Sequence, residues 1–94
     1  MTERRVALVT GASRGIGRAV ARELGRQGRI VIATATSESG AARIDEDLKA
    51  HDIEGLGLAL DVTDQASVEA IFKRITETYA APTIVVNNAG ITRH

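Results

Sequence analysis

The chain has 94 residues, of which 44% are hydrophobic, and its 12 Lys and Arg residues balance its 12 Asp and Glu residues. This length fits one small domain, or part of one, that buries about 65% of the surface exposed by the unfolded chain. The zero net charge excludes a general attraction to nucleic acid or to an anionic membrane, and the absence of cysteine excludes disulfides and thiolate metal sites. The first residues lack the apolar segment of a signal peptide, and every apolar run is far shorter than the roughly 20 residues that span a bilayer, so we expect a cytoplasmic protein.

The sequence begins with a predicted strand, helix and second strand. Residues 6–9 and 30–33 are apolar at every position, which is typical of strands covered on both faces in a parallel sheet. Between them, three apolar residues recur every four positions and predict an amphipathic helix: Ile16, Val20 and Leu24. Gly25 or Gly28 can end this helix in the left-handed conformation.

A second helix and a third strand follow. Residues 37–40 form a polar loop whose serines are good N-caps. The apolar stripe of the next helix consists of Ala41, Ile44 and Leu48. Residues 56–60 then alternate leucine with glycine or alanine, which predicts an edge strand under one well-packed face.

The last predicted helix has the clearest pattern. Thr63 or Asp64 can cap it. Its apolar stripe has helical spacing: Val68, Ile71, Phe72, Ile75 and Tyr79. Residues 84–86 form a fourth strand. The alternation of strands and helices predicts an α/β fold, the N-terminal half of a doubly wound Rossmann fold with parallel strand order 3-2-1-4, so that residues 1–94 form a partial nucleotide-binding domain.

A glycine-rich segment, residues 10–17, joins the first strand to the first helix. At this junction a helix N-terminus can bind a dinucleotide diphosphate. Gly11 can make the tight turn, Gly15 allows the backbone to approach the phosphates, and Gly17 allows the helix to pack closely on the strand. The alternative is an ordinary glycine-rich turn, but three glycines cost helix stability and so favour a functional reason.

The glycine spacing T-G-x-x-x-G-x-G resembles that of the short-chain dehydrogenases/reductases. Two further motifs support the resemblance: Asp61-Val62 after the third strand and Asn87-Asn88-Ala89-Gly90 after the fourth. The resemblance implies that Asp61 and the Val62 backbone meet the adenine edge, although Asp61 could instead be a local helix cap. It also implies that residues 88–90 lie beside the nicotinamide ribose, with Asn87 as a structural brace. The candidate cofactor-binding residues are Gly11, Ala12, Ser13, Arg14, Gly15, Ile16, Gly17, Thr36, Asp61, Val62, Asn88, Ala89 and Gly90.

Charge indicates which cofactor binds. Specificity for NAD usually requires a carboxylate directly after the second strand, where this chain has hydroxyl residues such as Thr36 and its nearest acid is Glu38. Arg14 in the glycine segment supplies a positive fork for a 2′-phosphate, unless it is only a solvated loop charge. We therefore expect NADP(H).

Within the family, residues 35–41 and 88–93 look most like the 3-oxoacyl-[acyl-carrier-protein] reductases of fatty-acid synthesis. These usually have an aspartate where this chain has His94, and sugar or steroid reductases share much of the rest. The resemblance implies hydride transfer from NADPH to the β-keto group of an acyl thioester, with an acyl-carrier-protein-linked substrate for the full-length family.

The family's chemistry uses a tyrosine and a lysine four residues later, together with a serine and an asparagine. The single tyrosine here, Tyr79, is followed four positions later by Thr83, and we interpret it as a core residue. His51 and His94 show no metal-ligand spacing and no acidic partner, so we interpret them as solvated and expect no metal site. We assign no catalytic residue and expect the chain to be inactive alone.

Two other classes of function stay open. The chain could hold a dinucleotide without redox chemistry, or it could be a half-domain that only associates with itself. Self-association is expected through residues 84–86, because their outer backbone groups lack a neighbouring strand and can pair with a second copy.

Overall fold

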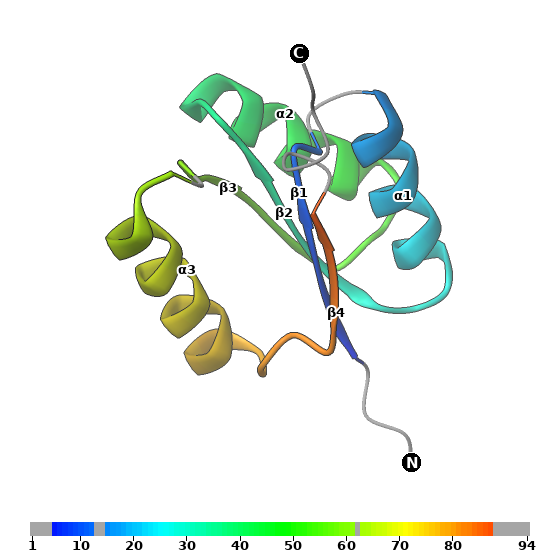
Figure 1. The fold of residues 1–94 in the computed structure, drawn as a ribbon. Helices are drawn as coiled ribbons and strands as arrows, with labels where there is room; N and C mark the ends of the chain where they lie inside the picture. The colour runs from blue at the N-terminus through cyan, green and yellow to red at the C-terminus, as the bar shows by residue number, and fades with distance from the viewer. Residues whose placement is uncertain (1–4, 13–14, 62, 88–94) are drawn as a thin grey trace.

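The computed structural model describes residues 5–12, 15–61 and 63–87, which form a parallel four-stranded sheet with helices on both faces (Figure 1). The elements in chain order are β1 (Val6–Thr10), α1 (Gly15–Arg26), β2 (Ile30–Ala35), α2 (Glu38–Ala50), β3 (Gly55–Ala59), α3 (Gln65–Thr78) and β4 (Ile84–Asn87). The strand order is β3-β2-β1-β4, with every neighbouring pair parallel. The predicted α/β class and strand order are confirmed.

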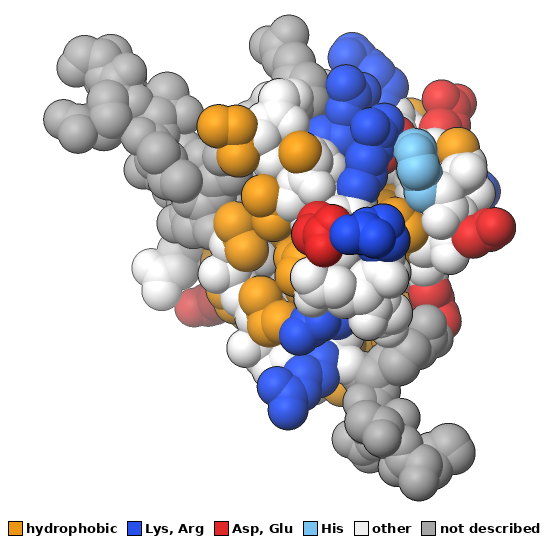
Figure 2. Space-filling view, turned by 90° about the vertical axis from the view of Figure 1, so that its right-hand side faces the viewer, with side chains coloured by type: hydrophobic (Ala, Val, Ile, Leu, Met, Phe, Trp, Pro, Cys, Tyr) orange, Lys and Arg blue, Asp and Glu red, His pale blue; other side chains and the backbone are white. Residues whose placement is uncertain are grey.

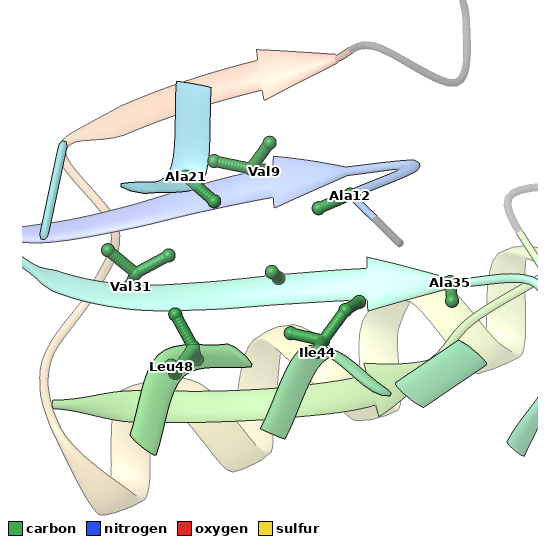
Figure 3. Close-up of a cluster of buried hydrophobic side chains, with 8 residues drawn as sticks. Val9, Ala12, Ala21, Val31, Ala35, Ile44 and Leu48 are labelled. Atoms are coloured by element: carbon green, nitrogen blue, oxygen red, sulfur yellow. The ribbon is translucent and has the colours of Figure 1, made fainter. Parts of the chain in front are cut away.

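The central strands β1 and β2 are buried on both faces because α1 and α2 cover one face of the sheet and α3 covers the other (Figure 1). The α1 and α2 side holds a cluster of eight buried residues, shown in Figure 3: Val9, Ala12, Ala21, Val31, Ala33, Ala35, Ile44 and Leu48. The α3 side holds a smaller cluster: Val6, Leu8, Ile32, Leu58 and Ile75. Successive strand residues alternate between the two clusters, as the two-residue period of a strand requires.

The buried face of α1 differs from the predicted stripe. Ile16 is 75% exposed, whereas Gly17 and Ala21 are buried and Val20 and Leu24 pack beside them. The buried positions have the spacing i, i+3, i+4, i+7, so the contact face is centred one residue later than Ile16. The prediction was wrong for Ile16 because glycine and alanine, which make the closest contacts, contribute little to a hydrophobic pattern.

Gly28, rather than Gly25, provides the left-handed residue that ends α1. Its φ is +89°, and its N–H donates to the Gly25 carbonyl at 2.9 Å. The N–H of Arg29 donates to the Leu24 carbonyl at 3.2 Å, which completes a Schellman motif. These two bonds satisfy carbonyls that the end of a helix leaves open.

The α2 helix packs directly on β3. Ser37 is its N-cap and accepts from the Gly40 N–H, as predicted. The predicted stripe of Ala41, Ile44 and Leu48 is buried. A Cβ on Gly57 would lie 2.3 Å from the Ala41 carbonyl oxygen, so the backbones approach too closely for a side chain. The expectation of a single packed face on β3 was therefore wrong, because glycine lets α2 cover the second face.

The α3 helix begins where the sequence places it. The Asp64 carboxylate accepts from the N–H groups of Ala66 and Ser67. Ile75 is fully buried, but Phe72 is 36% exposed, so the predicted stripe is only partly in the core. Phe72 lies roughly 60° around the helix from Ile75 and falls on the margin of the packed arc. Tyr79 is half-buried and packs against the α3 cluster, consistent with a structural role.

The two edges of the sheet differ. On β3, the outward N–H of Gly57 donates to a carboxylate oxygen of Asp45 in α2 at 2.9 Å. On β4, which pairs with β1, Val85 is 55% exposed. Among the described residues β4 has a strand on one side only. The β3 edge is thus capped by a charged side chain, while the outer strand β4 carries an exposed apolar side chain and, among the described residues, no such cap.

Candidate functional site

The carboxyl ends of β1, β2 and β3 meet at one edge of the sheet. Ala33 of β2 lies opposite Val9 of β1 and Gly57 of β3, so the three strands end close to one another. Gly11 directly follows β1, Thr36 directly follows β2, and Asp61 follows β3 by two residues. Parallel α/β folds bind ligands at this edge. The fold therefore brings these three sequence-predicted residues to the same side of the sheet.

The segment after β1 turns sharply and is fastened to β2. Gly11 has a φ of +65°, a conformation that favours glycine. Ala12 is only 2% exposed, and its N–H donates to the Thr34 carbonyl of β2 at 2.9 Å. Ala12 therefore serves the site by fixing the turn, because its own N–H is already used within the protein.

The start of α1 has the geometry of an anion site. Gly15 is the first helical residue, with a φ of +69°, and a Cβ built on it would have no neighbour within 4 Å among the described residues. Gly17, in the first turn of α1, is buried against the sheet side, while Ile16 is exposed. The first N–H groups of a helix lack intrahelical acceptors and carry a partial positive charge. An open glycine at this point leaves room for a phosphate to reach them, so the residues present fit a dinucleotide diphosphate.

Asp61 is exposed, and its carboxylate is held by Thr63. One oxygen, Oδ1, accepts from the Thr63 N–H at 3.0 Å and from the Thr63 hydroxyl at 2.6 Å. These hydrogen bonds lower the pKa of Asp61 below its ordinary value, the hydroxyl having the larger effect. Asp61 is not the cap of α3, because Asp64 has that role. The carboxylate is therefore an ionised acceptor at the ligand edge.

The end of β2 carries no carboxylate. Thr36 is exposed, Ser37 is occupied as the cap of α2, and Glu38 belongs to the first turn of that helix. Asn87, the last residue of β4, lies opposite Thr10 of β1. The remaining candidates lie outside the described residues: Ser13, Arg14, Val62, Asn88, Ala89 and Gly90.

A second feature lies at the far end of α1. A surface hollow of about 400 Å³ is lined by Ala19, Arg22, Glu23, Arg26, His51 and Ile53. It lies away from the carboxyl ends of the strands, and its charged residues have partners: Arg22 and His51 pair with Asp47, and Arg26 pairs with Glu23. Figure 2 shows basic side chains over this side of the molecule with the histidine beside them. We do not place the site here, because the paired charges leave no group aimed at a ligand.

The contacts beside this hollow contradict the expectation that His51 has no acidic partner. The Arg22 Nε and Nη2 donate to the Asp47 carboxylate at 2.9 and 2.5 Å. These bonds lower the pKa of Asp47 and join α1 to α2. His51 Nδ1 lies 2.8 Å from the Asp47 carbonyl and 3.7 Å from its carboxylate, so His51 does have an acidic partner, one helical turn back. Within the described ranges no three His, Asp or Glu side chains gather as a metal site would require.

No helix in the described parts of the chain is both long and apolar enough to cross a membrane.

The residues that sequence reasoning missed are Thr63 and Thr34, which fix Asp61 and Ala12. For Thr63 a signal existed, because a threonine two residues after an aspartate can donate back to its carboxylate. For Thr34 none existed, because its carbonyl meets Ala12 only in the folded sheet.

Comparison with known proteins agrees with this geometry. The sequence profile of the family described as short chain dehydrogenase matches residues 5–94. Proteins named 3-oxoacyl-[acyl-carrier-protein] reductase are similar along nearly the whole chain. The Pseudomonas aeruginosa protein is 62% identical over 89 residues, which cover 95% of this chain. Those of Vibrio harveyi and Escherichia coli are 58% and 54% identical over 91 residues, or 97% of this chain.

The matched region covers 36% of each of these relatives, so this chain spans about that share of their length. The family profile covers the strands, the glycine turn and the aspartate after β3 together. The chain belongs to the short-chain dehydrogenase family.

Proposed function

We propose that this chain is the N-terminal, cofactor-binding part of an NADPH-dependent 3-oxoacyl-[acyl-carrier-protein] reductase. The relatives that carry this name support the substrate class. The observation that carries the binding proposal is Gly15 at the start of α1, because its φ is +69° and a Cβ on it would meet no described residue within 4 Å, which suits a bound diphosphate. When bound, the cofactor supplies a hydride for reduction of a β-keto thioester.

Each part of the site has a task in this proposal. The turn from Gly11 to Gly17 holds the diphosphate, and Asp61 with the Val62 backbone takes the adenine edge. Thr36 lies beside the adenosine ribose, where Arg14 supplies positive charge for a 2′-phosphate. Asn88, Ala89 and Gly90 lie beside the nicotinamide ribose.

The chain is expected to bind NADPH more tightly than NADH. No carboxylate follows β2 to hold a free 2′-hydroxyl, and the Arg14 guanidinium can pair with the 2′-phosphate. A charge-assisted hydrogen bond contributes about 1.5–3 kcal/mol, so the preference should be about one to two decades and should largely vanish in Arg14→Ala. Calorimetric titration of both proteins with both cofactors measures it. Equal or tighter binding of NADH by the wild type, or an unchanged preference in Arg14→Ala, would contradict the assignment.

Reductase activity of these 94 residues alone is expected to stay at background. Tyr79 has Thr83 rather than lysine four positions later, so no acid with a tuning lysine is present in the chain. The assay follows NADPH oxidation, by the loss of its absorbance, in the presence of a β-ketoacyl thioester. Turnover that survives repurification would refute the expectation, and turnover with sugar or steroid ketones instead would change the substrate class.

We also propose that the chain self-associates through β4. Val85 is 55% exposed on the outer strand, whereas the opposite edge is capped by Asp45. A two-fold contact would pair two β4 strands antiparallel and join the two sheets into one. Light scattering should show a dimer at micromolar concentration, and Val85→Lys should shift it to monomer, because a charge on an edge strand opposes pairing. A wild-type chain that stays monomeric is the contrary result.

A further inference from the structure

We propose that Thr63 is a positioning residue for the cofactor: its hydroxyl and N–H both bind Asp61 Oδ1, which reserves Oδ2 for the amino group of the adenine ring. The inference rests on the proposed function and goes beyond it by assigning adenine recognition to a pair of residues. Thr63 itself need not touch the cofactor.

The geometry separates the two carboxylate oxygens. Thr63 donates to Oδ1 from its N–H at 3.0 Å and from its hydroxyl at 2.6 Å. The short hydroxyl bond is typical of a donor to an ionised carboxylate. Among the described residues no donor reaches Oδ2. A carboxylate that is fixed through one oxygen presents the other in a set direction, which reduces the entropy that a ligand must remove on binding.

The entry into α3 does not need this hydroxyl. Asp64 caps the helix by accepting from two N–H groups, and the Asp64 N–H itself closes the preceding turn on the Asp61 carbonyl at 3.0 Å. The backbone N–H of Thr63 also remains in any substitution. Thr63 is exposed, so its side chain adds nothing to the core. The hydroxyl bond therefore orients the Asp61 carboxylate and is not needed to start α3.

The electrostatics agree with this role. The Thr63 hydrogen bonds lower the pKa of Asp61, so its carboxylate stays ionised and can accept a hydrogen bond from the adenine amino group. The end of β3 is also fixed, because the Leu60 N–H donates to the Ala35 carbonyl of β2 at 2.8 Å. Asp61 is thus held from both sides, by the sheet before it and by Thr63 after it.

The test compares NADPH with its hypoxanthine analogue, in which a carbonyl oxygen replaces the adenine amino group. Calorimetry should show that the wild type binds NADPH about three- to tenfold more tightly than the analogue, the range of one net hydrogen bond. Thr63→Val should lose most of this discrimination by weakening NADPH binding alone. Thr63→Ser keeps the hydroxyl and should restore it. Thr76→Val, which removes a hydroxyl that donates to the Phe72 carbonyl within α3, is the matched control and should change neither affinity.

The outcomes separate this inference from the proposed function. A wild type that binds neither nucleotide overturns both. A wild type that binds NADPH, together with a Thr63→Val variant that loses affinity for both nucleotides equally or for neither, overturns the role of Thr63 alone. Circular dichroism and thermal melts of the variants show whether they fold, and Thr63→Ala serves as a second hydroxyl-free variant if the valine is not tolerated.

Discussion

Gly15→Ala is expected to weaken NADPH binding by about one to two decades, the loss of one charge-assisted hydrogen bond. The added Cβ has no protein neighbour within 4 Å among the described residues, so it projects into the space from which a phosphate approaches the helix start. The φ of +69° adds a strain of roughly 1–2 kcal/mol to the folded state. Calorimetric titration with NADPH, on protein shown to be folded, measures the loss.

Gly28→Ala is the matched control for this substitution. Gly28 has a φ of +89°, and a Cβ there also meets no described neighbour, but it lies at the opposite end of α1. Both variants should lose similar stability, while only Gly15→Ala should lose affinity. Parallel losses of affinity in the two variants would mean that strain in α1, rather than access to its N-terminus, controls binding.

Gly57→Ala is expected to lower the free energy of unfolding by about 3 kcal/mol, at the upper end of the cost of overpacking a core. The new Cβ would lie 2.3 Å from the Ala41 carbonyl oxygen and 2.8 Å from the Ile44 Cβ, so α2 must move away from β3. Such a movement disturbs the larger of the two buried clusters among the described residues, to which Ile44 belongs. Urea denaturation followed by circular dichroism gives the change.

Gly28→Ala is also the control for the loss of stability in Gly57→Ala. A methyl group that meets no described neighbour at a positive φ should cost roughly 1–2 kcal/mol, and each kcal/mol lowers the melting temperature of a domain of this size by about 4–8 °C. If Gly57→Ala proves no more destabilising than Gly28→Ala, then α2 is not held as closely on β3 as the contacts indicate.

The sheet could be predicted from the sequence because its signals are local. Two strands apolar at every position require cover on both faces, and the glycine turn marks which strand is first. The helix faces were harder to predict. Ile16 has a strong apolar side chain but lies at the exposed start of α1, while Gly17 and Ala21 make the close contact. Small residues pack backbones together without adding to a hydrophobic pattern.

The site was predictable where conformation alone decides it and not where partners meet through the fold. The glycine spacing anticipates the positive φ values of Gly11 and Gly15, which only glycine adopts readily. Asp61 is assigned by resemblance, and its bond to Thr63 has a local signal, whereas the bond from the Ala12 N–H to the Thr34 carbonyl joins two segments that meet only in the folded sheet. Hydrogen bonds of this last kind cannot be predicted from the order of the residues, because the fold brings their partners together.

The bond from the Ala12 N–H to the Thr34 carbonyl has a consequence for the speed of binding. A loop that must close over a ligand loses about 1–2 kcal/mol of entropy for each backbone residue that becomes ordered. Here the entry to the glycine turn is already bonded to β2, so the entropy of ordering Ala12 is lost on folding and not when a nucleotide binds. Association should therefore proceed in a single step whose rate rises linearly with nucleotide concentration in stopped-flow fluorescence, without the plateau that a slow loop closure produces.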